Sequence, residues 1–185
     1  MTVNAKWYQK RVAQTAIGGS TLRGHPKGTV DIVRKYLEGL NLQDFHRADQ
    51  HIFNSLLNRH THALQHQIKR LDSSAQYWGS ARKALNIFLA EASYHFILRK
   101  QYALNRIDRY LEVPLDKQVA HALRSKAGSQ GKHLPPFFTL KGLSDSDNVV
   151  YQEFASEYAR ERRCKRVELD LYLWRRGGKP ESVSR

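Results

Sequence analysis

Apolar residues recur at spacings of three and four along much of the chain, which is the period of an amphipathic helix. The clearest patterns predict helices over residues 29–39, 49–71 and about 80–97. The third segment begins after Gly79 and is apolar around much of its circumference, so we expect it to cross the middle of the core.

Other segments carry weaker signals. Residues 1–28 are punctuated by glycines and predict a loosely packed N-terminal arm with one short helix near residues 7–15. Residues 126–148 are rich in Gly, Ser, Lys and Pro and predict a surface loop, and residues 178–185 predict a frayed tail. We expect residues 1–185 to form a single helical domain.

Four more segments favour helices. Residues 106–111 predict a short helix, Asp116 stands where the N-cap of the next helix belongs, and a further helix begins near Val149. Residues 167–173 alternate as a strand would, but no partner strand is visible, so we predict a helix there too. The expected fold class is all-α.

Charge and composition narrow the range of possible binding partners. The 185 residues include 31 Lys and Arg against 17 Asp and Glu, a net charge of +14, and such a field attracts polyanions. Nucleic acid is the favoured partner and an anionic membrane is the main rival, although no segment has the clean apolar face of an interfacial helix. No apolar run reaches the roughly 18 residues that span a bilayer, so we expect a cytoplasmic protein. We also expect it to be a monomer.

Metal and thiol chemistry are weakly indicated. A single cysteine, Cys164, excludes a disulfide framework and multi-thiolate metal sites, and we interpret it as a small apolar residue although neighbouring arginines would favour its thiolate. His62 and His66 are one helical turn apart with His60 nearby, but the Glu of a His-Glu-x-x-His site is absent. We expect neither a metal nor another cofactor.

Lys83 and Asp116 are the candidates for chemistry. Lys83 falls one turn into the apolar helix, where desolvation, the adjacent Arg82 and the helix dipole would favour the neutral, nucleophilic amine. Taken alone, such a lysine more often contacts water or a phosphate, and Asp116 alone would be a helix cap. Their combination is more informative than either residue.

The segment 80–89, with Lys83, and the segment 113–120, with Pro114-Leu115-Asp116 and Val119, resemble the helix-hairpin-helix DNA glycosylases. The separation of 33 residues between Lys83 and Asp116 is most similar to that in the archaeal 8-oxoguanine DNA glycosylase branch. A C-terminal match, Leu169-Asp170 followed by Trp174, resembles the same branch.

The resemblance implies a helical fold with a cleft between two lobes, and an enzyme that extrudes a damaged or modified base from double-stranded DNA and cleaves its N-glycosidic bond. Lys83 would attack the sugar and give a Schiff base that can go on to strand cleavage by lyase chemistry, and Asp116 would assist. If Lys83 lies too far from C1′, a water would replace it and the enzyme would release the base without lyase activity. The residues implied for the base pocket are Asp170, Trp174, Ile87 and Phe88. Those implied for DNA contact are Gly79, Ser80, Arg82 and Lys117.

Two questions stay open at this point. The base could be 8-oxoguanine or a hypermodified base of the kind found in phage genomes, so that the role could be repair or phage defence. The alternative function is a non-catalytic helical DNA-binding protein, in which Lys83 contacts a phosphate and Asp116 only caps a helix. An RNA-binding module is less favoured, because aromatic-rich signatures of known RNA-binding folds are lacking.

Overall fold

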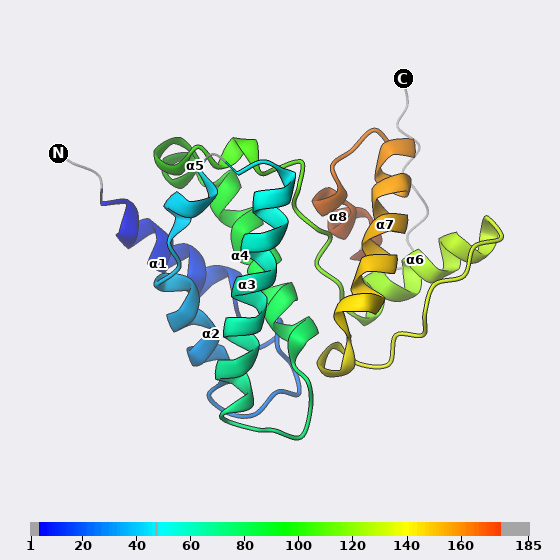
Figure 1. Ribbon diagram of the computed structural model, residues 1–185, viewed down its shortest axis with the longest axis horizontal. Coiled ribbons are helices and arrows are strands. Elements are labelled where there is room, and N and C mark those ends of the chain that lie inside the picture. The colour runs from blue at the N-terminus through cyan, green and yellow to red at the C-terminus, as the bar shows by residue number, and fades with distance from the viewer. Residues whose placement is uncertain (1–3, 47, 175–185) are drawn as a thin grey trace.

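The computed structural model describes residues 4–46 and 48–174, and this part of the chain contains helices and turns but no strand (Figure 1). The all-α prediction is therefore confirmed. The elements are α1 (Ala5–Ala16), α2 (Thr29–Glu38), η1 (Leu42–Phe45), α3 (Gln50–Lys69), α4 (Trp78–Tyr94), α5 (Phe96–Tyr102), η2 (Leu104–Arg106), α6 (Lys117–Ser129), η3 (Leu140–Gly142), α7 (Asp145–Glu161), η4 (Arg166–Glu168) and α8 (Leu169–Trp174), where η marks a 3₁₀ helix.

The described residues form two hydrophobic clusters, and each belongs to one lobe. The N-terminal lobe, up to residue 111, is built from α1–α5, whereas the C-terminal lobe, from residue 113, is built from α6–α8. Figure 1 shows the two groups of helices side by side. Val167 of η4 packs in the N-terminal cluster, so the chain returns to the first lobe near its C-terminus.

Helix α4 is the centre of the N-terminal lobe. Thirteen of its seventeen residues are buried, and it packs against α1, α2, α3, α5 and η3. This position confirms the prediction drawn from its apolar circumference, because a helix that is apolar on all sides has to be covered on all sides.

The N-terminal segment is packed more closely than its glycines indicate. Ile17 and Leu22 are buried in the core, and α1 contacts α2, α4 and α5. The buried amide of Gln9 donates to the carbonyl oxygens of Leu37 at 2.9 Å and Leu40 at 2.7 Å. These bonds satisfy carbonyl oxygens at the C-terminal end of α2 and just after it. The expected loose arm is therefore wrong for residues 4–28.

A capping side chain marks the start of two of the predicted helices, but only one of them begins where it was predicted. Asp49 accepts a hydrogen bond from the Ile52 amide at 2.8 Å and starts α3 as predicted. Ser144 caps α7, which begins at Asp145 rather than near Val149. The segment predicted as a short helix over residues 106–111 forms turns after η2 instead.

The predictions for the last three segments of the chain differ in how they compare with the structure. Helix α6 extends to Ser129, and Phe137 and Leu143 are buried in the C-terminal cluster, so residues 126–148 are only partly a surface loop. Residues 167–173 are helical in η4 and α8, as predicted. The predicted frayed tail, 178–185, lies outside the described residues.

Candidate active site

The first turn of α4 is fixed by close packing against η3. Tyr77 precedes the helix in the left-handed conformation, with φ of 58°, and its amide donates to the Lys141 carbonyl at 3.0 Å. A Cβ at Gly79 would lie 2.6 Å from both the Leu140 carbonyl oxygen and Leu143 Cβ. Glycine at position 79 therefore permits the approach of η3, and its burial does not favour the predicted contact with DNA.

Lys83 lies on the next turn of α4 and meets Asp116 from the other lobe. Asp116 is the N-cap of α6, and its Oδ1 accepts hydrogen bonds from the amides of Gln118 at 2.9 Å and Val119 at 3.0 Å. The second oxygen, Oδ2, accepts from Lys83 Nζ at 3.2 Å. The two residues that the sequence separates by 33 positions are therefore in direct contact, and one carboxylate both caps a helix and pairs with the amine.

The pair opens into a cavity of about 290 Å³ between the lobes. The cavity is lined by Ser20, Thr21, Lys83, Ile87, Asp116 and Asp170. Burial, together with the nearby charge of Asp116, raises the pKa of Asp170 to about 6, while Lys83 opposes this shift. Three ionisable side chains from α4, α6 and α8 thus converge on one small pocket, an arrangement typical of functional sites.

The structure corrects several of the predicted site residues. Ser80 and Arg82 are buried, so their side chains are not available to contact DNA. Phe88 is fully buried in the N-terminal cluster and does not reach the pocket, whereas Ile87, one turn after Lys83, does. Lys117 is exposed at the start of α6, where its predicted DNA contact remains a prediction. The side chain of Trp174 lies outside the described part of the structure.

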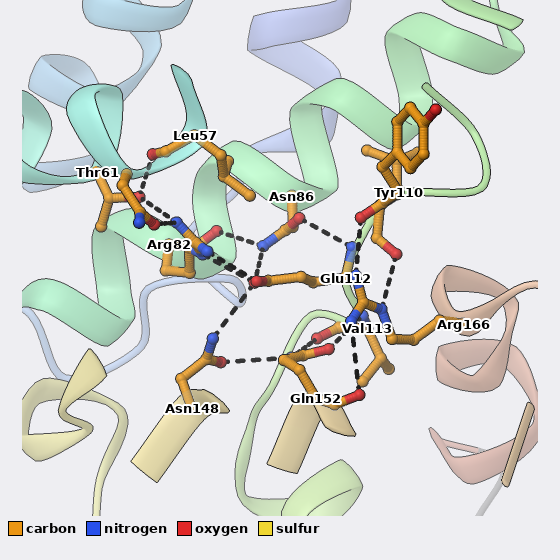
Figure 2. A network of polar contacts seen from close by, with 12 residues as sticks. Leu57, Thr61, Arg82, Asn86, Tyr110, Glu112, Val113, Asn148, Gln152 and Arg166 are labelled. Atoms are coloured by element: carbon orange, nitrogen blue, oxygen red, sulfur yellow. Dashed lines mark hydrogen bonds and ion pairs between the residues drawn. The ribbon is translucent and has the colours of Figure 1, made fainter. Parts of the chain in front are cut away.

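Arg82 instead forms a buried ion pair with Glu112 at the junction of the lobes (Figure 2). Its Nε and Nη2 donate to the two carboxylate oxygens at 2.8 and 2.7 Å, and Asn86 donates to the same carboxylate at 3.0 Å. Burial alone would raise the pKa of Glu112, but the hydrogen bonds and charge of Arg82 outweigh it and hold that pKa below its ordinary value.

This network also holds the segment that leads to Asp116. Gln152 of α7 accepts from the Val113 amide at 3.1 Å and donates to the Val113 carbonyl at 2.9 Å (Figure 2). Arg166 donates to the carbonyl oxygens of Tyr110 at 2.7 Å and Leu111 at 3.1 Å. Because these contacts fix the backbone just before Asp116, they help to place its carboxylate opposite Lys83.

Sequence reasoning missed the N-terminal wall of the pocket, Ser20 and Thr21, and the histidine that follows it. His25 donates from Nδ1 to the Leu22 carbonyl at 2.9 Å, and its Nε2 lies 2.6 Å from Ser80 Oγ. Burial lowers the pKa of His25, and the charges of Lys141 and Lys83 add to this effect. No local pattern in the sequence signals that this loop returns to α4.

The remaining candidate residues do not assemble into a site. His60 Nδ1 lies 2.7 Å from the Tyr36 hydroxyl, whereas His62 and His66 are exposed on α3. Within residues 4–46 and 48–174, no three metal-ligating side chains come together. Burial raises the pKa of the Cys164 thiol, which overrides the expected effect of the neighbouring arginines.

None of the described helices combines the length and the apolar character that crossing a membrane requires. No protein-family model, curated protein or solved structure matches this chain.

Proposed function

We propose that the protein is a DNA glycosylase that extrudes a damaged or modified base into the interlobe pocket and cleaves its N-glycosidic bond, with Schiff-base chemistry at Lys83. The observation that carries the proposal is the 3.2 Å contact between Lys83 Nζ and Asp116 Oδ2 in the pocket that Asp170 also lines. A nucleophilic amine beside a carboxylate in a concave, partly desolvated site suits attack on a sugar carbon.

The residues have distinct roles in this reaction. As the glycosidic bond breaks, its electron pair leaves with the base, and the negative charge of Asp116 stabilises the electron-poor C1′ of the sugar. Asp116 then accepts a proton from Lys83, whose free electron pair forms the bond to C1′. Opening of the sugar ring gives the Schiff base, and loss of a proton from C2′ expels the 3′-phosphate and cuts the strand.

Asp170 is the candidate for base recognition. With its pKa at about 6, it is mostly a carboxylate at neutral pH and accepts hydrogen bonds from N–H groups on the edge of an extruded base. Ile87 provides apolar contact in the same pocket. The base is 8-oxoguanine or a hypermodified base, and the two differ in whether the enzyme serves repair or phage defence.

The wider features of the molecule support a DNA partner. A net charge of +14 favours binding to phosphates and makes the affinity strongly dependent on salt. A pocket between two helical lobes is compatible with the fold of the helix-hairpin-helix glycosylases, in which we place the chain as part of this proposal. Such an enzyme would act on DNA in the cytoplasm, as a monomer and without a cofactor.

Borohydride trapping tests the proposal, because borohydride reduces a Schiff base to a stable covalent bond. The wild-type protein should give a covalent adduct with a duplex that carries an abasic site, and Lys83→Gln should lose at least about 90% of it. Lys100→Gln is the matched control, since Lys100 is exposed on α5, at the other end of α4 from Lys83. It should form the adduct as the wild type does.

Base release is the second readout. The wild type should release a base from duplexes that carry 8-oxoguanine or a glucosylated 5-hydroxymethylcytosine. Absence of both the adduct and base release, with DNA binding intact, would contradict the proposal and favour a non-catalytic DNA-binding protein.

A further inference from the structure

The loop between α1 and α2 forms one wall of the candidate pocket. Ser20 and Thr21 line the same cavity as Lys83 and Asp170, although they lie more than 60 residues away from either along the chain. This wall therefore exists only because the loop folds back over the first turn of α4.

The two hydroxyl side chains of the loop differ in what they contact. Thr21 Oγ1 accepts from the Gly18 amide at 3.2 Å and lies 3.5 Å from the Ala16 carbonyl, so it stabilises the turn itself. Ser20 is exposed, and its hydroxyl has no hydrogen-bond partner among the described residues. The Ser20 hydroxyl is therefore free to bind a group that enters the pocket.

His25 attaches this loop to the helix that carries Lys83. Because its ring is neutral and Nδ1 donates to the Leu22 carbonyl at 2.9 Å, Nε2 is left to accept from the Ser80 hydroxyl at 2.6 Å. Ser80 is fully buried on the first turn of α4, one turn before Lys83. Burial of Ile17 and Leu22 anchors the loop to the core, and the His25–Ser80 contact ties it directly to the helix that carries the amine.

We propose that Ser20 determines base specificity by donating a hydrogen bond to an oxygen that the modification adds to the base, and that His25 is the positioning residue for the Ser20 loop. The inference rests on the proposed glycosylase function. Asp170 binds an N–H group of the base, while Ser20 binds the added oxygen. Both base classes named above carry such an oxygen, and an unmodified base lacks it.

The test compares two reactions of the same variant. Release of the modified base requires the base pocket, whereas trapping at an abasic site requires Lys83 chemistry but no base. The probes are duplexes with 8-oxoguanine, with glucosylated 5-hydroxymethylcytosine and with an abasic site. Ser20→Ala should lower the ratio of base release to abasic-site trapping about fivefold, the effect of one lost hydrogen bond. Ser55→Ala, the same change at an exposed position of α3, should leave this ratio as in the wild type.

Variants of His25 test the positioning role. His25→Ala should lower the ratio at least as much as Ser20→Ala and raise KM for the modified duplex, because the Ser20 loop is no longer held. His25→Gln retains a polar group that can bond to Ser80, and it should restore most of the ratio. A role in stability alone would reduce both reactions together and leave the ratio unchanged.

The outcomes separate the two proposals. If the wild type neither forms the adduct nor releases a base, the glycosylase function itself fails. If the wild type is active but the ratio is unchanged in Ser20→Ala, or if it traps the abasic site but releases neither modified base, the specificity inference is overturned and the role of Lys83 stands.

Discussion

Arg82 and Lys83 are consecutive residues of α4, yet their side chains enter two different kinds of polar environment. The Arg82–Glu112 pair is closed in the sense that its charged groups bond to protein: its side chains are only 7% and 9% exposed, and asparagines from both lobes complete the carboxylate's hydrogen bonds, although the pair also borders a cavity of about 530 Å³. The Lys83–Asp116 pair forms a single 3.2 Å contact and faces a cavity.

This difference separates a structural cluster from a candidate reactive one. A buried ion pair whose hydrogen bonds are all made gives specific geometry but leaves no group free for a ligand. Among the described residues, Lys83 Nζ makes one hydrogen bond and retains donors that are not used, and Asp170 remains in the same pocket with a raised pKa. The closed cluster holds the two lobes together, and the open one is available for chemistry. Variants in the closed cluster should therefore lose stability, whereas variants in the open cluster should lose activity.

The largest effect is expected for Arg82→Met, which leaves the Glu112 carboxylate buried without its main partner. The free energy of unfolding should fall by about 3–5 kcal/mol, as measured by urea denaturation. Arg124→Met is the control, because Arg124 is exposed on α6, and it should change stability by less than about 0.5 kcal/mol. A loss below about 1 kcal/mol in Arg82→Met would show that the two clusters do not differ as we describe.

Substitutions of Asp116 separate its charge from its role as a cap. Asp116→Asn retains the N-cap of α6 but removes the negative charge, so base release should fall at least about a hundredfold with little change in stability. Asp116→Ala should be equally inactive and less stable than Asp116→Asn by about 1 kcal/mol. Wild-type base release in Asp116→Asn would leave Asp116 with the cap as its only function.

Asp170→Asn should improve stability while it reduces base release. Because the folded protein raises the pKa of Asp170 from 3.8 to about 6, it binds the proton more tightly than the unfolded chain does, and keeping the carboxylate charged costs stability as the pH rises. At pH 7 the variant should therefore be more stable by about 3 kcal/mol, and below about pH 4 the gain should vanish. Equal gains at pH 7 and pH 4 would contradict the assigned burial of this carboxyl.

Local patterns were sufficient for most of the helices and for part of the site. The spacing of apolar residues predicted α2, α3 and the central position of α4, since it reflects the helical period directly. The same period explains why Ile87 lines the pocket and Phe88 does not. Ile87 is four residues after Lys83 and shares its face, whereas Phe88 is turned toward the core.

Contacts between distant segments were not predictable from one sequence. Glu112 is 30 residues from Arg82, and nothing in its own surroundings marks it as the partner that removes Arg82 from the surface. Ser20 lies in a glycine-rich stretch typical of a loose arm, and its place in the pocket depends on the burial of Ile17 and Leu22 and on the contact of His25 with Ser80. Such pairings are set by the packing of the whole chain.

The most direct test of the account locates the covalent bond. After borohydride reduction of the wild-type protein on an abasic duplex, nuclease and protease digestion followed by mass spectrometry should find the sugar remnant on Lys83. The remnant should be absent from Arg82 and from the exposed lysines, such as Lys100 and Lys117. A remnant spread over surface lysines, or found at one lysine other than Lys83, would contradict the claim that the Lys83–Asp116 pair is the reactive centre.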